Sequence, residues 1–193
     1  MTNHIVRYFL IIALFFICVF AEIAFAGHKW MDFLRNPTGT TSEALIQRLN
    51  ACNKTDKCME AKPDSEEVYK LIALIKSGNP YAVDVAFFSL NLDLFDGGEL
   101  GDVVRSLGQL AEINPKLLLR SLKRHGIIGY PFENIMIILP LEAVDDSNAK
   151  IRTVQKRIDS ISTVNDPSLI NERDQAILVL KRRLAQLQER KEP

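Results

Sequence analysis

Histidine and cysteine, which supply much of the nucleophilic and metal-binding chemistry of proteins, are scarce here, with three residues of each. No serine lies in a Gly-x-Ser-x-Gly turn, and neither a His-Glu-x-x-His motif nor a Gly-rich phosphate loop is present. These absences remove the usual sequence signatures of serine hydrolases, zinc peptidases and P-loop enzymes. The sequence therefore gives catalysis little support, and we expect no cofactor.

Excess charge of either sign is also absent, because 24 lysine and arginine residues balance 24 aspartate and glutamate residues. Proteins that bind nucleic acid need a concentrated basic surface to replace the counterions of the phosphates. A neutral chain gives no electrostatic argument for such a surface, so we expect no nucleic-acid partner.

One long apolar run, YFLIIALFFICVF (8–20), follows Arg7 near the amino terminus. The small residues Ala24 and Ala26 then form the pattern that signal peptidase accepts. A basic start, an apolar core and a small-x-small site together predict a signal peptide over residues 1–26. The mature protein is then expected to be periplasmic or secreted, with no membrane contact after cleavage.

An uncleaved membrane anchor over residues 5–26 is the alternative, since a spanning helix needs about 20 apolar residues. This stretch is interrupted by Arg7 and Glu22, and its unbroken core is closer to signal-peptide length, which favours cleavage before Gly27. Removing 26 of the 193 residues leaves 167, enough for one domain with a hydrophobic core.

Two cysteines remain after cleavage, because Cys18 lies within the signal peptide. Cys52 and Cys58 are separated by the polar, flexible segment NKTDK, and disulfides persist in an oxidising compartment. We therefore predict a Cys52–Cys58 disulfide. A redox pair or half of a metal site is less favoured, because the spacing is not Cys-x-x-Cys and no histidine lies near.

Apolar residues recur at intervals of three and four through most of the chain, which is the spacing of one helix face. The segment 131–141 has no second strand candidate to pair with, so we expect it to be helical too. The pattern predicts an all-α fold, a single compact multi-helix domain. Its helices are expected to start at Ser42, Asp64, Asn79–Pro80, Glu99, Asn114–Pro115 and Asp166–Pro167.

We divide the mature chain into an amino-terminal arm (27–41), a helical body (42–145) and an antiparallel helical hairpin (146–193). In the arm, Trp30 and Phe33 have helical spacing and are expected to dock on the body.

The hairpin is expected to pack through Ile158, Ile177 and Leu184, which heptad spacing places on facing seams. Its last helix, predicted over 167–191, is longer than its partner. Part of it must therefore contact the domain, a partner or a second copy, so this helix is a candidate for forming oligomers.

The two Asn-Pro helix starts, at residues 79 and 114, lie 35 residues apart, and leucine-rich helices follow them. Over residues 79–126 the chain resembles HEAT-type repeats, in which pairs of helices stack. The resemblance implies an architecture and no activity.

Acidic residues recur every three positions around Gly97-Gly98: Asp93, Asp96, Glu99 and Asp102. Several carboxylates from one loop are the ligands of hard cations, although the spacing differs from that of an EF-hand. Caps at a helix start, which its dipole favours, are the ordinary interpretation. An envelope enzyme that uses the carboxylates of residues 93–102 is the alternative function.

Basic residues gather on one predicted helix: Lys116, Arg120, Lys123 and Arg124. They are candidates for binding an acidic protein or envelope polymer. Cations also suit the negative end of a helix, which is the ordinary explanation for such a group.

Cleavage before Gly27 would expose Gly27-His28-Lys29, the sequence of a copper-binding tripeptide. The terminal amine of Gly27, the His28 amide and the His28 imidazole are nitrogen donors suited to tetragonal Cu(II). Copper binding by Gly27 and His28 is a minor alternative. The leading expectation is a non-catalytic exported helical module that binds a protein partner through a helix groove or the terminal hairpin.

Overall fold

Helices make up all the regular secondary structure in residues 29–52 and 61–189, which are the residues that the computed structural model describes. The all-α prediction is confirmed. The α-helices are α2 (Lys29–Arg35), α3 (Gly39–Cys52), α4 (Ser65–Lys76), α5 (Pro80–Asn91), α6 (Gly97–Ile113), α7 (Pro115–Arg124), α8 (Gly129–Ile137), α9 (Ser147–Ser162) and α10 (Ile170–Glu189). The 3-10 helices are η2 (Leu141–Ala143) and η3 (Pro167–Leu169).

Three sequence predictions lie outside the described residues. They are the signal peptide over 1–26, copper binding by Gly27 and His28, and the Cys52–Cys58 disulfide, which requires Cys58.

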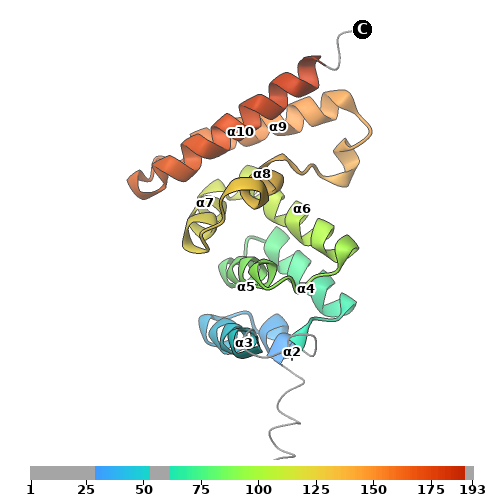
Figure 1. Cartoon of the computed structure of the whole chain (residues 1–193), viewed down its shortest axis with the longest axis vertical. Helices are drawn as coiled ribbons and strands as arrows, with labels where there is room; N and C mark the ends of the chain where they lie inside the picture. Colours follow the sequence, from blue (N-terminus) through green and yellow to red (C-terminus); the bar gives the residue numbers. More distant parts are fainter. Residues whose placement is uncertain (1–28, 53–60, 190–193) are drawn as a thin grey trace, which may run out of the picture.

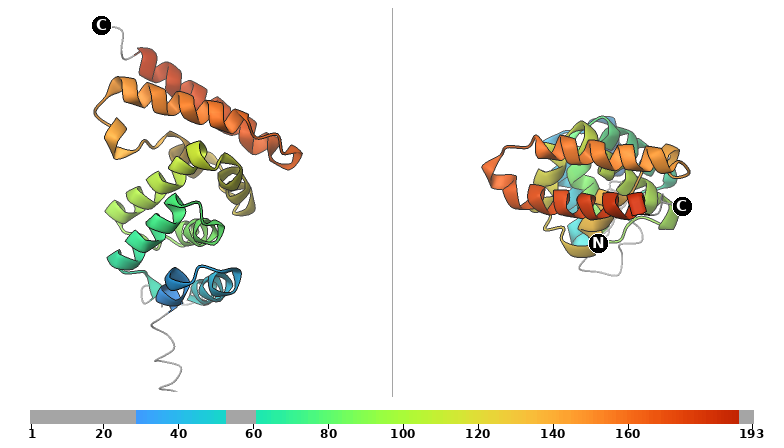
Figure 2. Two further views of the ribbon diagram at one scale, coloured as in Figure 1. Left: turned by 180° about the vertical axis from the view of Figure 1, so that it is seen from behind. Right: turned by 90° about the horizontal axis from the view of Figure 1, so that it is seen from above.

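Helices α2 to α7 form a stack of pairs in two layers (Figure 1). In one layer α4 packs between α2 and α6, and in the other α5 packs between α3 and α7. Consecutive helices α2 and α3, α4 and α5, and α6 and α7 also contact each other across the layers. The hairpin of α9 and α10 covers one end of this stack, where α8 packs on both α6 and α10 (Figures 1 and 2).

Both Asn-Pro starts cap helices of the same layer. The Asn79 side chain accepts hydrogen bonds from the backbone N–H groups of Tyr81 and Ala82, both at 3.0 Å. The Asn114 side chain accepts one from Leu117 at 3.2 Å. Each proline then occupies the first turn, where its missing N–H costs nothing. The 35-residue spacing therefore relates α5 to α7, which lie next to each other in the stack.

The predicted start of α4 at Asp64 is confirmed by a capping box, in which Asp64 accepts the Glu67 backbone N–H at 2.8 Å and Glu67 accepts that of Asp64 at 3.0 Å. Desolvation raises the pKa of the Glu67 carboxyl above its ordinary value. The predicted start of α3 at Ser42 is three residues late, because the Thr38 hydroxyl caps the helix by accepting the Thr41 N–H at 3.3 Å.

Helix α6 begins at Gly97 rather than at the predicted Glu99, so the two glycines belong to its first turn. Helix α5 is apolar nearly all round, contacts helices of both layers, and ends at Asn91. Asp93 then adopts a left-handed backbone conformation with φ of 54°, and Phe95 is buried from the turn rather than from the helix.

The amino-terminal helix α2 docks on the body as expected. Phe33 and Trp30 are buried, and the indole Nε1 of Trp30 donates a hydrogen bond to the carbonyl of Ala61 at 2.9 Å. This bond satisfies the only polar atom of a side chain that is otherwise in the core.

The hairpin seam agrees with the prediction in part, since Ile158, Ile177 and Leu184 all pack on the core. Ile158 is buried, but Ile177 and Leu184 are only partly buried. The buried stripe of α10 consists of Ala176, Leu180 and Leu187. The stripe is rotated because α10 packs on α8 and α7 as well as on α9.

One buried arginine ties α9 to the end of α8. The Arg157 side chain is fully buried, and its Nη1 donates to the carbonyls of Met136 and Ile138, both at 2.7 Å. Its Nε donates to Glu112 of α6 at 3.2 Å. Desolvation lowers the pKa of Arg157, and the Glu112 carboxylate opposes that shift. These bonds fix the point at which the chain leaves α8 towards η2.

Candidate binding groove

A groove of about 200 Å³ lies across α6, with α4 on one side and η2 on the other. In Figure 2, α6 lies between α4 and the segment that joins α8 to α9. Helix α6 is therefore the floor, and α4 and η2 are the walls. The lining residues are Tyr69, Ile72, Lys76, Asp102, Arg105, Ser106, Gln109, Leu141 and Glu142.

The spacing of these residues explains the groove. Tyr69, Ile72 and Lys76 lie three and four positions apart, so they share one face of α4. The α6 residues from Asp102 to Gln109 have the same spacing. The two helices run in the same direction, because their first residues lie side by side. Lys62, three residues before α4, binds Asp96 at 3.1 Å, and the Ser65 hydroxyl donates to Glu99 at 2.7 Å.

Arg105 fixes the η2 wall to the floor. Its Nε donates to the backbone carbonyl of Leu139 at 3.0 Å, two residues before η2 begins. Its Nη1 lies 3.5 Å from the Asp102 carboxylate, and the Ser106 hydroxyl donates to the Asp102 carbonyl at 2.8 Å. The polar side chains of Asp102, Arg105 and Ser106 on the floor of the groove thus already have partners within the chain.

Both walls expose large apolar side chains. Tyr69 on α4 is 64% exposed and Leu141 on η2 is 62% exposed. Within the described ranges 29–52 and 61–189, neither Lys76 on the α4 wall nor Glu142 on the η2 wall has an ion-pair partner. An apolar contact on each wall beside an available charge is suited to holding a segment of another molecule.

The predicted acidic cluster is spread over separate contacts. Asp96 binds Lys62, Glu99 accepts from Ser65, and Asp102 contacts Arg105. Asp93 lies in the turn before α6. Among the residues that the structure describes, no group of three histidine, cysteine, aspartate or glutamate side chains is placed to hold a metal ion.

The predicted basic group lies on α7 and contacts carboxylates of the same chain. Lys116 and Arg120 lie 3.1 and 3.9 Å from Asp166, which precedes η3. Lys123 lies 4.0 Å from Glu172 of α10, and Arg124 pairs with Asp84 of α5. Three of the four cations therefore face the hairpin, and each is still about half exposed.

The Asp166 carboxylate is the centre of this contact. The Ser168 hydroxyl, Lys116 and the Ser168 backbone N–H all stabilise its charged form, which lowers its pKa to about 2. Binding of an external acidic partner by the α7 cations stays a prediction, and such a partner would compete with Asp166 for Lys116.

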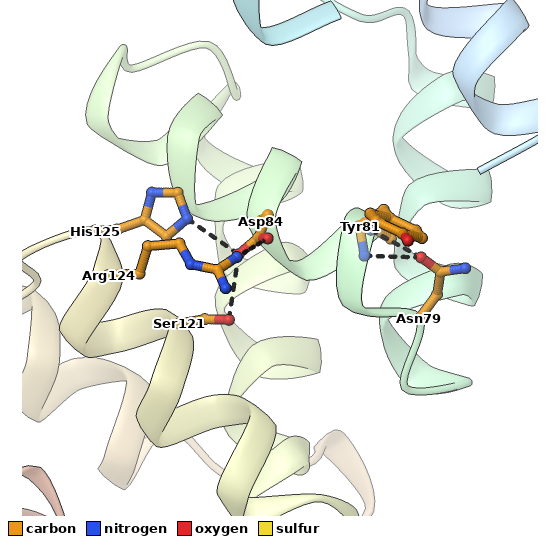
Figure 3. A network of polar contacts seen from close by, with 7 residues as sticks. Asn79, Tyr81, Asp84, Ser121, Arg124 and His125 are labelled. Atoms are coloured by element: carbon orange, nitrogen blue, oxygen red, sulfur yellow. Dashed lines mark hydrogen bonds and ion pairs between the residues drawn. The ribbon is translucent and has the colours of Figure 1, made fainter. Parts of the chain in front are cut away.

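A second polar network, which the sequence reasoning missed, joins α5 to α7 (Figure 3). Asp84 accepts from Ser121 at 3.4 Å and pairs with Arg124, and His125 Nε2 lies 3.3 Å from the same carboxylate. The His125 ring stacks on Phe87 with centroids 5.7 Å apart. The hydroxyl and the imidazole both face the carboxylate rather than each other, so this is not the geometry of a nucleophile and its base. In the sequence, this network could have been found from Asp84, an aspartate within the otherwise apolar helix α5.

None of the described helices is long and apolar enough to cross a membrane. No protein-family model, no curated protein and no solved structure matches this chain.

Proposed function

We propose that this protein is an exported, non-catalytic helical module that binds a partner protein in the groove between α4, α6 and η2. The exposure of Tyr69 and Leu141 on its two walls carries the proposal. Large apolar side chains that remain in water around a recess are typical of interaction surfaces, and tyrosine is enriched among residues that dominate binding.

The stack of helix pairs supports the same function. We extend the resemblance to HEAT-type repeats from residues 79–126 to the pairs α4 with α5 and α6 with α7, because the equivalent helices α5 and α7 are neighbours. Stacked helix pairs present continuous surfaces that such proteins use to bind partners. In this chain the groove crosses the layer that contains α4 and α6.

The alternative of an envelope enzyme has less support. Catalysis by a pair of carboxylates, as in glycoside hydrolysis, needs two carboxyl groups that converge on one cleft. The carboxylates of residues 93–102 instead have separate partners along the start of α6. Export to the periplasm or the exterior rests on residues 1–26 alone.

The groove is also favoured over the terminal hairpin as the binding surface. The outward side chains of α10 include Asp174, Lys181 and Gln186, and its exposed large apolar residues, Ile170 and Leu178, are eight positions apart. A polar helix face of this kind is ordinarily solvated, so we place neither the partner nor a second copy there.

Replacing Tyr69 by alanine is expected to abolish capture of the partner in a pull-down of the exported protein from envelope extract. Tyr69 is exposed, so its loss should leave the fold intact. Tyr130→Ala is the matched control, because Tyr130 is 79% exposed and lies outside the groove. Equal loss of partner in both variants, or no loss in either, would contradict the proposed site.

A further inference from the structure

The groove has a charge on each wall that nothing in the described chain neutralises. Lys76 is the last residue of α4 and is exposed, and Glu142 lies in η2 and is also exposed. The other cation that lines the groove, Arg105, already contacts Asp102 and the Leu139 carbonyl. Lys76 and Glu142 are therefore the two charged groups that a bound molecule can pair without breaking an existing contact.

We infer that the groove binds a peptide segment that has a large apolar side chain, an acidic side chain for Lys76 and a basic side chain for Glu142. This inference rests on the proposed function and specifies the partner. The apolar side chain would contact Tyr69 and Leu141, which project from the same two walls as the charges.

Charge complementarity would also fix how the segment lies. Lys76 is on the α4 wall and Glu142 on the η2 wall, so a segment with both charges meets attraction in one placement and repulsion in the reverse. Exposed pairs add little affinity, but like charges placed opposite each other discriminate strongly between partners. The charges therefore select the segment, and the apolar walls supply most of its affinity.

The test is selection of random twelve-residue peptides, displayed on phage, against the immobilised exported protein. The selected peptides are expected to combine an apolar residue with one acidic and one basic residue, and to lose binding to Tyr69→Ala. Lys76→Glu is expected to bind those peptides about tenfold more weakly and to select basic residues in place of the acidic one. Glu142→Lys is expected to select peptides that have an acidic residue in place of the basic one.

Lys181→Glu is the control, because Lys181 is an exposed lysine on α10 that does not line the groove. Peptides that need Tyr69 but bind equally to the parent, Lys76→Glu and Glu142→Lys proteins would overturn this inference and leave the proposed function standing. If no selected peptide depends on Tyr69, the proposed function fails and this inference fails with it.

Discussion

Replacing Gly108 by alanine is expected to lower the free energy of unfolding by about 2 to 3 kcal/mol. Gly108 lies in α6 where α8 crosses it, and a Cβ atom there would be 2.6 Å from the Ile135 carbonyl oxygen and 3.1 Å from Ile138 Cγ2. The first contact is with backbone, which cannot move aside as a flexible side chain can. Helices α6 and α8 would have to separate.

Gly101→Ala in the same helix is the matched control. A Cβ atom at Gly101 meets nothing within 4 Å, and alanine is a better helix former than glycine. This variant is expected to raise the free energy of unfolding by about 0.5 to 1 kcal/mol. Urea denaturation of the two variants, followed by circular dichroism, measures both effects. Equal free energies would mean that α6 and α8 do not meet at Gly108.

Replacing Arg157 by methionine is expected to lower the free energy of unfolding by about 2 to 5 kcal/mol, because two buried carbonyl groups each lose their donor at about 1 to 3 kcal/mol. Methionine keeps much of the volume, but the carbonyls of Met136 and Ile138 would lose the donor that they share. Buried carbonyl groups without a donor are costly, so the end of α8 would have to rearrange. Denaturation with urea gives the difference in free energy.

Lys156→Met is the control that separates the effect of losing a buried side chain from the effect of losing a positive charge. Lys156 binds the same carboxylate, Glu112, at 3.2 Å but is 63% exposed. An exposed pair contributes little, so this variant is expected to stay within about 0.5 kcal/mol of the parent. If the two variants were equally stable, Arg157 would not be the buried link between α9 and α8.

The features that could be predicted from the sequence are those that depend on neighbouring residues. Asp64 with Glu67, Asn79 with Pro80, and Asn114 form caps within three or four positions of the chain, so their patterns identify the helix starts directly. Thr38 was missed as the cap of α3, because Ser42 has the same chemistry a few residues later.

The candidate site depends on tertiary packing and could not be predicted in the same way. The groove brings Tyr69 to one side of α6 and Leu141 to the other, and no local pattern relates these two residues. The hairpin seam shows the same limit. Heptad spacing treats α9 and α10 as an isolated pair, whereas α10 also packs on α8 and α7, and Leu180 is buried more deeply than Ile177.

The two-layer stack explains which predicted residues meet. Stacking sets α7 beside α5, which brings Arg124 to Asp84, and the hairpin places Asp166 over Lys116. The α7 cations therefore have partners within the chain, whereas Lys76 and Glu142 of the groove have none among residues 29–52 and 61–189.

Photo-crosslinking in the cell shows whether the groove binds a protein partner. A photoreactive amino acid placed at position 69 and, separately, at position 141 is expected to crosslink to one and the same partner, because these residues lie on opposite walls of one groove. The same amino acid at position 130, which is more open to solvent than either groove position, is expected not to crosslink to it. Crosslinking from position 130 alone, or from neither groove position, would show that the groove does not bind the partner.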